Sequence, residues 1–174
     1  MKTLLLMRHA KSDRSQDGLS DIERPLNKRG RKACDALAAF LSRRSLAPDI
    51  ALVSVARRTQ ETWERMAETL GEPPLDLRRD LYLAEPREIL DAINGIGEFS
   101  RPLILGHNPG IEQAASLLAA PEQAPPGQAA LANLHGKFPT GAIAMFRYPD
   151  IPWSDVRFGM GEILEFVMPA SLAP

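Results

Sequence analysis

The hydrophobic pattern of the chain begins with a short continuous apolar run. Residues Leu4 to Met7 are apolar at four successive positions, and the run ends in Arg8 and His9. A continuous run of this length is typical of a strand that is buried on both faces of a sheet. In open α/β sheets, ligands bind beyond the carboxyl ends of such strands. The first strand therefore places a guanidinium and an imidazole where a binding site is expected.

Five more segments of the chain are predicted to form strands. They are short, largely apolar runs that are bounded by Pro, Gly or polar residues: 49–54, 75–77, 102–106, 142–147 and 161–168. The last two are predicted to pair as a hairpin at one edge of the sheet. Trp153 lies in the loop between them, where it either covers that edge or packs on the surface.

Apolar residues at helical spacing separate these strands. Four helices are predicted: 28–44, 57–70, 86–94 and one that follows residue 108. Asn27 and Asn108 are favourable N-caps for the first and the last of them, and Pro109 suits the first position after such a cap. The stretch 121–139 is rich in Pro, Ala and Gln, and it predicts a long, partly irregular connection with one short helix at 129–134.

Strands that alternate with helices indicate an α/β fold. We expect a three-layer sandwich, with a mostly parallel central sheet, helices on both faces and an antiparallel pair of strands at one edge. The chain shows no internal repeat and no linker of the kind that separates domains, so residues 1–174 are expected to form a single domain.

Composition narrows the classes of partner. The chain has 21 Lys and Arg against 22 Asp and Glu, which gives a formal net charge of -1, and so long-range attraction to nucleic acid is not expected. No apolar run reaches transmembrane length, and the first apolar stretch is too short for a signal peptide, which predicts a cytoplasmic protein that does not bind membranes. The single cysteine, Cys34, allows no internal disulfide and is expected to be a small packed residue.

Polar side chains follow three of the predicted strands. They are Arg8 and His9, Arg57 and Arg58, and His107. If these strands are parallel, all of the side chains meet at one edge of the sheet. Arginine binds tetrahedral oxyanions in a fork geometry and keeps its proton, and the start of the helix at Asn108 adds free backbone N–H groups. Phosphate is therefore the expected ligand at this edge, with Asn108 among the groups that bind it.

A zinc site is the competing use of two histidines. His9 and His107 have no compact set of further ligands in the sequence, and the adjacent arginines would repel a cation. The chain also contains no Gly-rich loop that ends in Gly-Lys-Ser/Thr, so a P-loop nucleotide site is not expected. We therefore expect neither a metal nor a cofactor.

Four ordered segments resemble the histidine phosphatase superfamily, whose fold is that of phosphoglycerate mutase. Met7-Arg8-His9-Ala10 is similar to its Arg-His-Gly/Ala signature, and Asp21-x-x-Arg24-Pro25-Leu26, with Gly30, resembles its SixA-type phosphohistidine phosphatase branch. Residues 53–62 are similar to its Ser-Ser-Pro-x-x-Arg-Ala-x-Gln-Thr segment, and residues 106–108 match its second catalytic histidine. Val55 stands where the family usually has proline, and Glu61 where it usually has glutamine.

The resemblance implies a phosphatase that carries the phosphoryl group on one of its own histidines. His9 would attack phosphorus, and water would then hydrolyse the phosphohistidine intermediate. The groups that would hold the phosphate oxygens are Arg8, Arg58, His107 and Arg24. In this alignment the catalytic arginine is Arg58 and not Arg57. The arginines supply fixed positive charge, so the reaction needs no metal.

The family's proton donor has no clear counterpart in this chain. Glu85 lies in the matching region and Asp13 lies in the loop after His9, and each is a candidate. The alternative for each is an ordinary carboxylate that is exposed to solvent. An imidazole leaving group, with a reference pKa near ~6.5, needs less help from a proton donor than an alkoxide does. The missing acid therefore favours phosphohistidine on a protein as the substrate. The alternatives are a phosphomonoesterase that acts on a small phosphorylated metabolite, with one of these carboxyls as the acid, and a non-catalytic phosphate-binding regulatory module.

Overall fold

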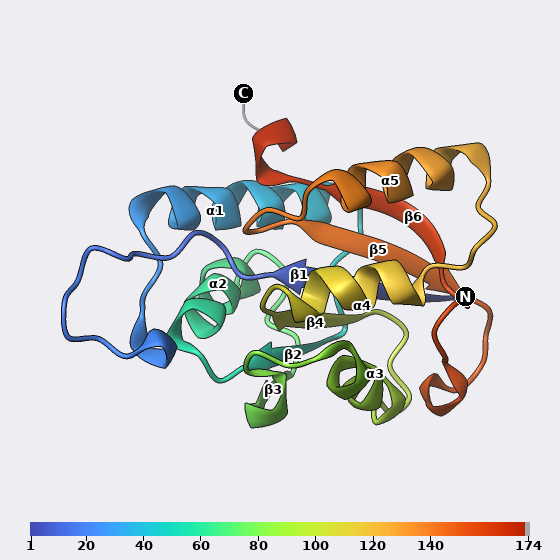
Figure 1. Cartoon of the computed structure of the whole chain (residues 1–174), viewed down its shortest axis with the longest axis horizontal. Helices are drawn as coiled ribbons and strands as arrows, with labels where there is room; N and C mark the ends of the chain where they lie inside the picture. Colours follow the sequence, from blue (N-terminus) through green and yellow to red (C-terminus); the bar gives the residue numbers. More distant parts are fainter. Residues whose placement is uncertain (173–174) are drawn as a thin grey trace.

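The computed structural model describes residues 1–172, and within them six strands form one sheet between two layers of helices (Figure 1). The strands are β1 (Lys2–Arg8), β2 (Ile50–Ser54), β3 (Leu75–Arg78), β4 (Pro102–Gly106), β5 (Ile143–Tyr148) and β6 (Glu162–Val167). Their order across the sheet is β3-β2-β4-β1-β5-β6. The first four in this order are parallel, whereas β5 is antiparallel to both β1 and β6. This confirms the predicted α/β fold with a mostly parallel sheet and an antiparallel terminal pair.

Five α-helices in this part of the chain cover the two faces of the sheet. Helices α1 (Lys28–Arg43) and α2 (Arg57–Ala67) share a core with one face, and α3 (Pro86–Asn94), α4 (Gly110–Leu118) and α5 (Pro125–Gly136) share a core with the other. Successive residues of β1 alternate between the two cores, because side chains of a strand point to opposite faces. None of the described helices is long and apolar enough to cross a membrane.

The start of α1 fixes the segment that follows β1. The side chain of Asn27 accepts a hydrogen bond from the N–H of Gly30 at 2.8 Å, which confirms the predicted cap. A Cβ atom at position 30 would lie 2.2 Å from the carbonyl oxygen of Lys11, so glycine is needed for this close approach. The N–H of Asn27 also donates to that carbonyl at 3.0 Å. The residues just after His9 are therefore held against α1.

The start of α4 differs from the prediction. The helix begins at Gly110, and the side chain of Asn108 does not cap it; its amide nitrogen donates instead to the carbonyl of Phe138 at 3.0 Å. The prediction that Asn108 is the N-cap is wrong because a distant part of the chain uses its amide. Gly110 is required for packing, since a Cβ atom there would lie 1.8 Å from the carbonyl oxygen of Ala84.

The connection between α4 and β5 is also more ordered than predicted. Helix α5 has 12 residues, whereas the sequence suggested a short helix at 129–134. Pro125 and Pro126 occupy its first turn, where backbone N–H groups have no partner within the helix in any case. The prolines therefore begin the helix and do not interrupt it. His135, near its end, is exposed.

Trp153 is fully buried, so neither position suggested by the sequence is correct. Its indole N–H donates to the carbonyl of Phe99 at 2.7 Å, and its ring meets that of Tyr148 edge-on, with the centroids 5.8 Å apart. The side chain belongs to the core beside α3 and does not cover the free edge of β6. A single aromatic residue in a proline-rich loop has no periodicity that would reveal this burial.

Cys34 is fully buried on the inner side of α1. Burial raises the pKa of its thiol to about 12, so the group stays protonated and unreactive. This confirms that Cys34 is a packed residue and not a nucleophile.

Candidate active site

The strands β2, β4 and β1 end side by side at one edge of the sheet and bring the predicted side chains together. Arg8 of β1 lies in register with Gly106 of β4, so His9 and His107 follow at neighbouring strand ends. Their ring centroids are 5.4 Å apart. Arg58, in the first turn of α2 after β2, reaches the same place, with its Nη2 atom 3.2 Å from Nδ1 of His107.

His9 is held with one ring nitrogen free. The side chain is 6% exposed, and its Nδ1 atom lies 2.7 Å from the carbonyl oxygen of Ala10. A carbonyl only accepts, so Nδ1 carries the proton. Burial, assisted by the charges of Arg58 and Arg8, lowers the pKa of His9 to about 3. The ring is therefore neutral at pH 7, and Nε2 has a lone pair to which no group in residues 1–172 donates a hydrogen bond.

His107 has both ring nitrogens engaged. Its Nε2 lies 2.7 Å from the hydroxyl oxygen of Ser54, while its Nδ1 faces the guanidinium of Arg58. A guanidinium only donates, so Nδ1 accepts from Arg58 and the Nε2–H group donates to Ser54. Burial, together with the positions of His9 and Arg58, lowers the pKa of His107 to about 3. This second imidazole is neutral, but both of its ring nitrogens are hydrogen-bonded to protein groups.

A carboxylate to which the sequence analysis assigned no role, that of Asp21, joins two of the arginines. It accepts hydrogen bonds from Nη2 of Arg58 at 3.0 Å and from the hydroxyl of Tyr82, and its other oxygen accepts from Nη2 of Arg24 at 3.1 Å. Burial acts to raise the pKa of Asp21, but the hydrogen bonds from Tyr82 and Arg58 hold it well below its usual range. Asp21 is therefore an anion at neutral pH that fixes Arg24 and Arg58 relative to each other.

Three buried arginine N–H groups have no partner within the described chain, the Nε atoms of Arg8, Arg58 and Arg101. The first two flank the histidines, whereas Arg101 precedes β4 at the opposite edge of the sheet. The guanidinium of Arg8 is anchored by Nη1, which donates to the carbonyl of Phe138 at 3.1 Å. Buried donors without a partner are costly, so their occurrence in two arginines that flank the histidines indicates a site built for an anion.

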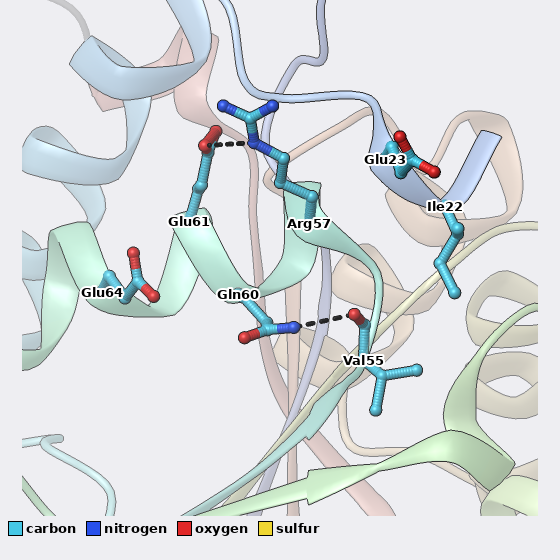
Figure 2. Close-up of a pocket in the computed structure, with 7 residues that line it drawn as sticks. All are labelled: Ile22, Glu23, Val55, Arg57, Gln60, Glu61 and Glu64. Carbon is cyan, nitrogen blue, oxygen red and sulfur yellow. Dashed lines mark hydrogen bonds and ion pairs between the residues drawn. The ribbon is translucent and has the colours of Figure 1, made fainter. Parts of the chain in front are cut away.

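Arg57 and Arg58 point in different directions, although they are adjacent in the sequence. Figure 2 shows Arg57 turned along α2 toward Glu61, whose Oε2 accepts from its Nε at 3.2 Å. The other oxygen of Glu61 accepts from the N–H of Leu26 at 2.8 Å. Glu61, which stands where the family usually has glutamine, therefore braces the segment that carries Arg24, and Arg57 stays outside the site.

Thr62 connects α2 to the backbone beside His9, and sequence reasoning missed it. Its hydroxyl donates to the carbonyl of Arg58 at 2.6 Å and accepts from the N–H of Ala10 at 3.1 Å. Ala10 also supplies the carbonyl that holds Nδ1 of His9. The only signal for Thr62 in the sequence was its position at the end of the segment 53–62.

Asn108 acts on the site indirectly. Its amide nitrogen donates to Phe138, whose carbonyl also accepts from Arg8, and its own side-chain oxygen is buried with no partner among residues 1–172. A second, longer contact joins the same nitrogen to the carboxylate of Glu112 at 3.3 Å. The structure thus places Asn108 behind Arg8.

The two carboxyl groups suggested as proton donors are engaged elsewhere. Glu85 is exposed at the start of α3, where its carboxylate accepts from the N–H of Glu88 and its own N–H donates to the carboxylate of Glu88 at 3.1 Å. Asp13 accepts from the N–H and the hydroxyl of Ser15, at 2.7 and 2.6 Å, and these bonds lower the pKa of Asp13. Within the described chain, neither carboxyl group hydrogen-bonds to His9 or Arg58.

Comparison with known proteins agrees with this geometry. A model of the histidine phosphatase superfamily (branch 1) matches residues 4–85. A solved protein from Nakamurella multipartitia, assigned as a phosphohistidine phosphatase SixA, superposes with a TM-score of 0.82 at 27% identity, over 97% of this chain and 96% of that chain. The chain belongs to branch 1 of the histidine phosphatase superfamily.

Two further similarities extend over almost the whole of this chain. The protein histidine phosphatase SixA complexed with tungstate shares its fold, with a TM-score of 0.78 and 20% identity over 98% of this chain and 99% of that chain. An uncharacterised protein of Mycobacterium tuberculosis is 33% identical over 165 residues, which are 94% of this chain and 99% of that protein. The segment matched to the family includes His9, Arg24 and Arg58, and the fold then adds His107 because β4 lies between β2 and β1.

Proposed function

We propose that this histidine phosphatase removes phosphate from phosphohistidine on a protein, through a phosphohistidine intermediate on His9. The observation that carries the proposal is the state of the His9 ring. Its Nδ1–H is fixed on the carbonyl of Ala10, its pKa is low, and its Nε2 lone pair is free beside Arg8 and Arg58. A neutral imidazole with a free nitrogen is the form that attacks phosphorus.

The reaction takes place in two displacements. In the first, the free ring nitrogen of the substrate's phosphohistidine takes a proton from solvent. Nε2 of His9 then bonds to phosphorus while the bond between phosphorus and the substrate's other ring nitrogen breaks, and neutral imidazole leaves. In the second, water attacks phosphorus and gives a proton to solvent while the bond between phosphorus and Nε2 of His9 breaks, so that inorganic phosphate leaves and His9 returns to its neutral form. The free N–H groups of Arg8 and Arg58 hold the phosphoryl oxygens in both steps, where the negative charge is largest. Arg24, linked to Arg58 through Asp21, completes the phosphate site, and His107 positions Arg58 by accepting from its Nη2.

The choice of a phosphohistidine substrate rests on the state of the nearby acids. Asp21 is held as an anion by Arg58 and Tyr82, Asp13 is held as an anion by Ser15, and Glu85 is exposed. Asp21 and Asp13 therefore hold no proton to donate, and Glu85 makes no hydrogen bond to His9 or Arg58 among the described residues. Imidazole is a far weaker base and leaves without such a donor. The likeness to a protein assigned as phosphohistidine phosphatase SixA supports the same substrate class.

Trapping the phosphoenzyme tests the proposal. The wild-type protein and the variant His9→Asn are mixed with a peptide that carries ³²P-labelled phosphohistidine, and with a labelled phosphomonoester, and are quenched in alkali, in which phosphohistidine is stable. We expect acid-labile label on the wild type only, and faster turnover of the phosphohistidine peptide. Label on His9→Asn would show that His9 is not the nucleophile. Efficient cleavage of the ester without cleavage of the peptide would show that the substrate is a phosphomonoester and not phosphohistidine.

The competing phosphomonoesterase function needs Glu85 or Asp13 as an acid. For hydrolysis of the phosphohistidine peptide, we expect Glu85→Gln and Asp13→Asn each to change kcat by less than about twofold, because solvent protonates the leaving imidazole. Loss of the alkaline limb of the pH–rate profile in either variant, measured with a phosphomonoester, identifies that carboxyl as the proton donor and favours the competing function.

A further inference from the structure

A groove of about 450 Å³ opens beside Arg8. It lies toward β5, on the side of β1 that faces away from β2 and Arg58. Lys11, from the segment after β1, and Arg29, from the first turn of α1, line it together with Lys137, which precedes β5. Pro139 and Met168 give it an apolar wall. We call this the basic groove.

The charge of the basic groove is one-sided. Four cationic side chains line it, and no carboxylate of residues 1–172 does so, although the whole chain carries 22 acidic against 21 basic residues. None of the ion pairs within residues 1–172 includes Arg8, Lys11, Arg29 or Lys137. The carboxylate of Glu112 acts on Arg8 at longer range, from the side of α4. Clustered like charges repel each other, and a bound anion relieves that repulsion.

The cations are attached to backbone segments that are fixed in place. Lys11 is held against α1 by the hydrogen bond from Asn27 and by the close approach at Gly30, with Arg29 between these two residues. Lys137 precedes Phe138, whose carbonyl accepts from both Arg8 and Asn108. The backbone positions that carry these cations are therefore fixed before any ligand arrives, so that the entropic cost of binding is limited to that of the side chains.

Arg8 lines both the phosphate site and the basic groove, so the two sites are adjacent. Its free Nε is one of the donors assigned to the phosphoryl group, and its side chain also lines the basic groove. A substrate whose phosphate lies beside His9 therefore has its neighbouring atoms next to this groove. A volume of a few hundred Å³ suits a few residues of peptide better than a flat protein face.

We propose that the basic groove binds an acidic segment of the phosphorylated protein, next to its phosphohistidine. The proposal rests on the proposed function, because it concerns the substrate of the same site. Aspartate and glutamate side chains of the segment pair with Lys11, Arg29 and Lys137, and the apolar wall contacts the rest of the peptide. The chemistry of the basic groove therefore selects phosphohistidines in acidic surroundings.

Three substrates separate the two sites: a phosphohistidine peptide flanked by three glutamates, the same peptide with glutamines, and free phosphohistidine. We expect wild-type kcat/KM to be roughly 10-fold higher for the glutamate peptide than for the glutamine peptide, the size expected from three exposed ion pairs. Raising the NaCl concentration from 50 to 500 mM removes this preference, because exposed charges are screened. The salt series needs no variant.

The groove variant is Lys11→Gln/Arg29→Gln/Lys137→Gln, and its matched control is Lys28→Gln/Lys32→Gln/Arg43→Gln. The control removes three exposed cations from α1 outside the basic groove and lowers the net charge equally. We expect the groove variant alone to lose the preference for the glutamate peptide, while both variants keep wild-type activity on free phosphohistidine within about twofold.

Four results overturn the proposal. Equal wild-type rates on the two peptides show that the basic groove does not bind the segment, and a loss of preference in the control shows that net charge alone accounts for it. A groove variant that loses inhibition by inorganic pyrophosphate but keeps the peptide preference shows that a second phosphate is the occupant. If the wild type cleaves neither the peptides nor free phosphohistidine, the proposed function itself fails, and this outcome differs from the other three.

Discussion

The two histidines show how similar surroundings produce different chemistry. His9 and His107 follow adjacent parallel strands, both are nearly buried, and burial lowers both pKa values to about 3. They differ in their hydrogen bonds. His9 uses one nitrogen and keeps the other free, whereas His107 uses both. Burial therefore makes each ring neutral, and the hydrogen-bond partners determine which ring is able to act as a nucleophile.

Replacing each ring by asparagine gives the largest expected effect. In His9→Asn the side-chain amide still donates to the carbonyl of Ala10 but has no nucleophilic nitrogen, and we expect kcat to fall at least ~10³-fold with no phosphoenzyme. In His107→Asn the nucleophile remains, but the imidazole that accepts from Arg58 is lost, and the less well placed guanidinium lowers kcat by roughly 10²-fold. Rapid quench in alkali measures both quantities.

The difference in labelling is the decisive part of this comparison. His107→Asn is expected to accumulate label, and His9→Asn to show none. Label on His9→Asn together with its loss in His107→Asn reverses the two roles.

Stability against pH tests what the two rings have in common. Because both folded-state pKa values lie below the unfolded value near ~6.5, the unfolded chain takes up protons first as the pH falls, and stability is lost below that value. Between pH 7 and 5 we expect about 2 kcal/mol of unfolding free energy to be lost per histidine. Urea unfolding, followed by tryptophan fluorescence at several pH values, measures the loss.

His9→Asn is the control for this experiment. It lacks one of the two buried rings, so its unfolding free energy should fall by about half as much as that of the wild type over the same range. An unchanged pH dependence in His9→Asn means that His9 titrates near its ordinary pKa, and that burial does not keep its ring neutral.

The variant Asp21→Asn tests how much the carboxylate beside Arg58 contributes to the site around His107. The substitution keeps the shape of the side chain but removes the anion that fixes Arg24 and Arg58. We expect kcat to fall roughly 10-fold, because the guanidiniums are less well placed, while inorganic phosphate inhibits more strongly, because a neighbouring negative charge is gone. Weaker inhibition by phosphate together with the lower kcat shows general disruption of the site instead.

Ser54→Ala gives the smallest expected effect. It removes the acceptor of the Nε2–H group of His107 but leaves the contact between Nδ1 and Arg58. We expect kcat to fall about threefold and Ser54→Thr to restore it, since threonine keeps the hydroxyl. A loss as large as that of His107→Asn shows that the tautomer, and not the ring itself, is the essential feature.

Most of the candidate site at the carboxyl ends of β1, β2 and β4 is predictable from local sequence pattern. Apolar runs that end in Arg8 and His9, and in His107, locate two strand ends, and the parallel sheet brings them together. The resemblance of residues 53–62 to the family selects Arg58 over Arg57, and in the structure Arg58 contacts His107 whereas Arg57 pairs with Glu61. These inferences succeed because each depends on residues that are close in sequence to a strand end.

The remaining parts of the site depend on contacts between distant segments. Asp21 lies in a polar loop and acquires its partners only when Arg58 and Tyr82 are brought to it. Asn108 has the sequence context of a cap, yet its amide bonds to Phe138, which is 30 residues away. Propensity describes what a residue does in the absence of such partners, and it therefore fails where tertiary hydrogen bonds compete.

The hydroxyl of Thr62 has a consequence for motion in the site. Through it, the first turns of α2 and the peptide of Ala10 form one continuous hydrogen-bonded unit, 52 residues apart in sequence. We therefore expect a local opening of α2 to release the backbone that orients His9 at the same time as it withdraws Arg58. Nucleophile and phosphate-binding arginine would then be lost together, without unfolding of the sheet.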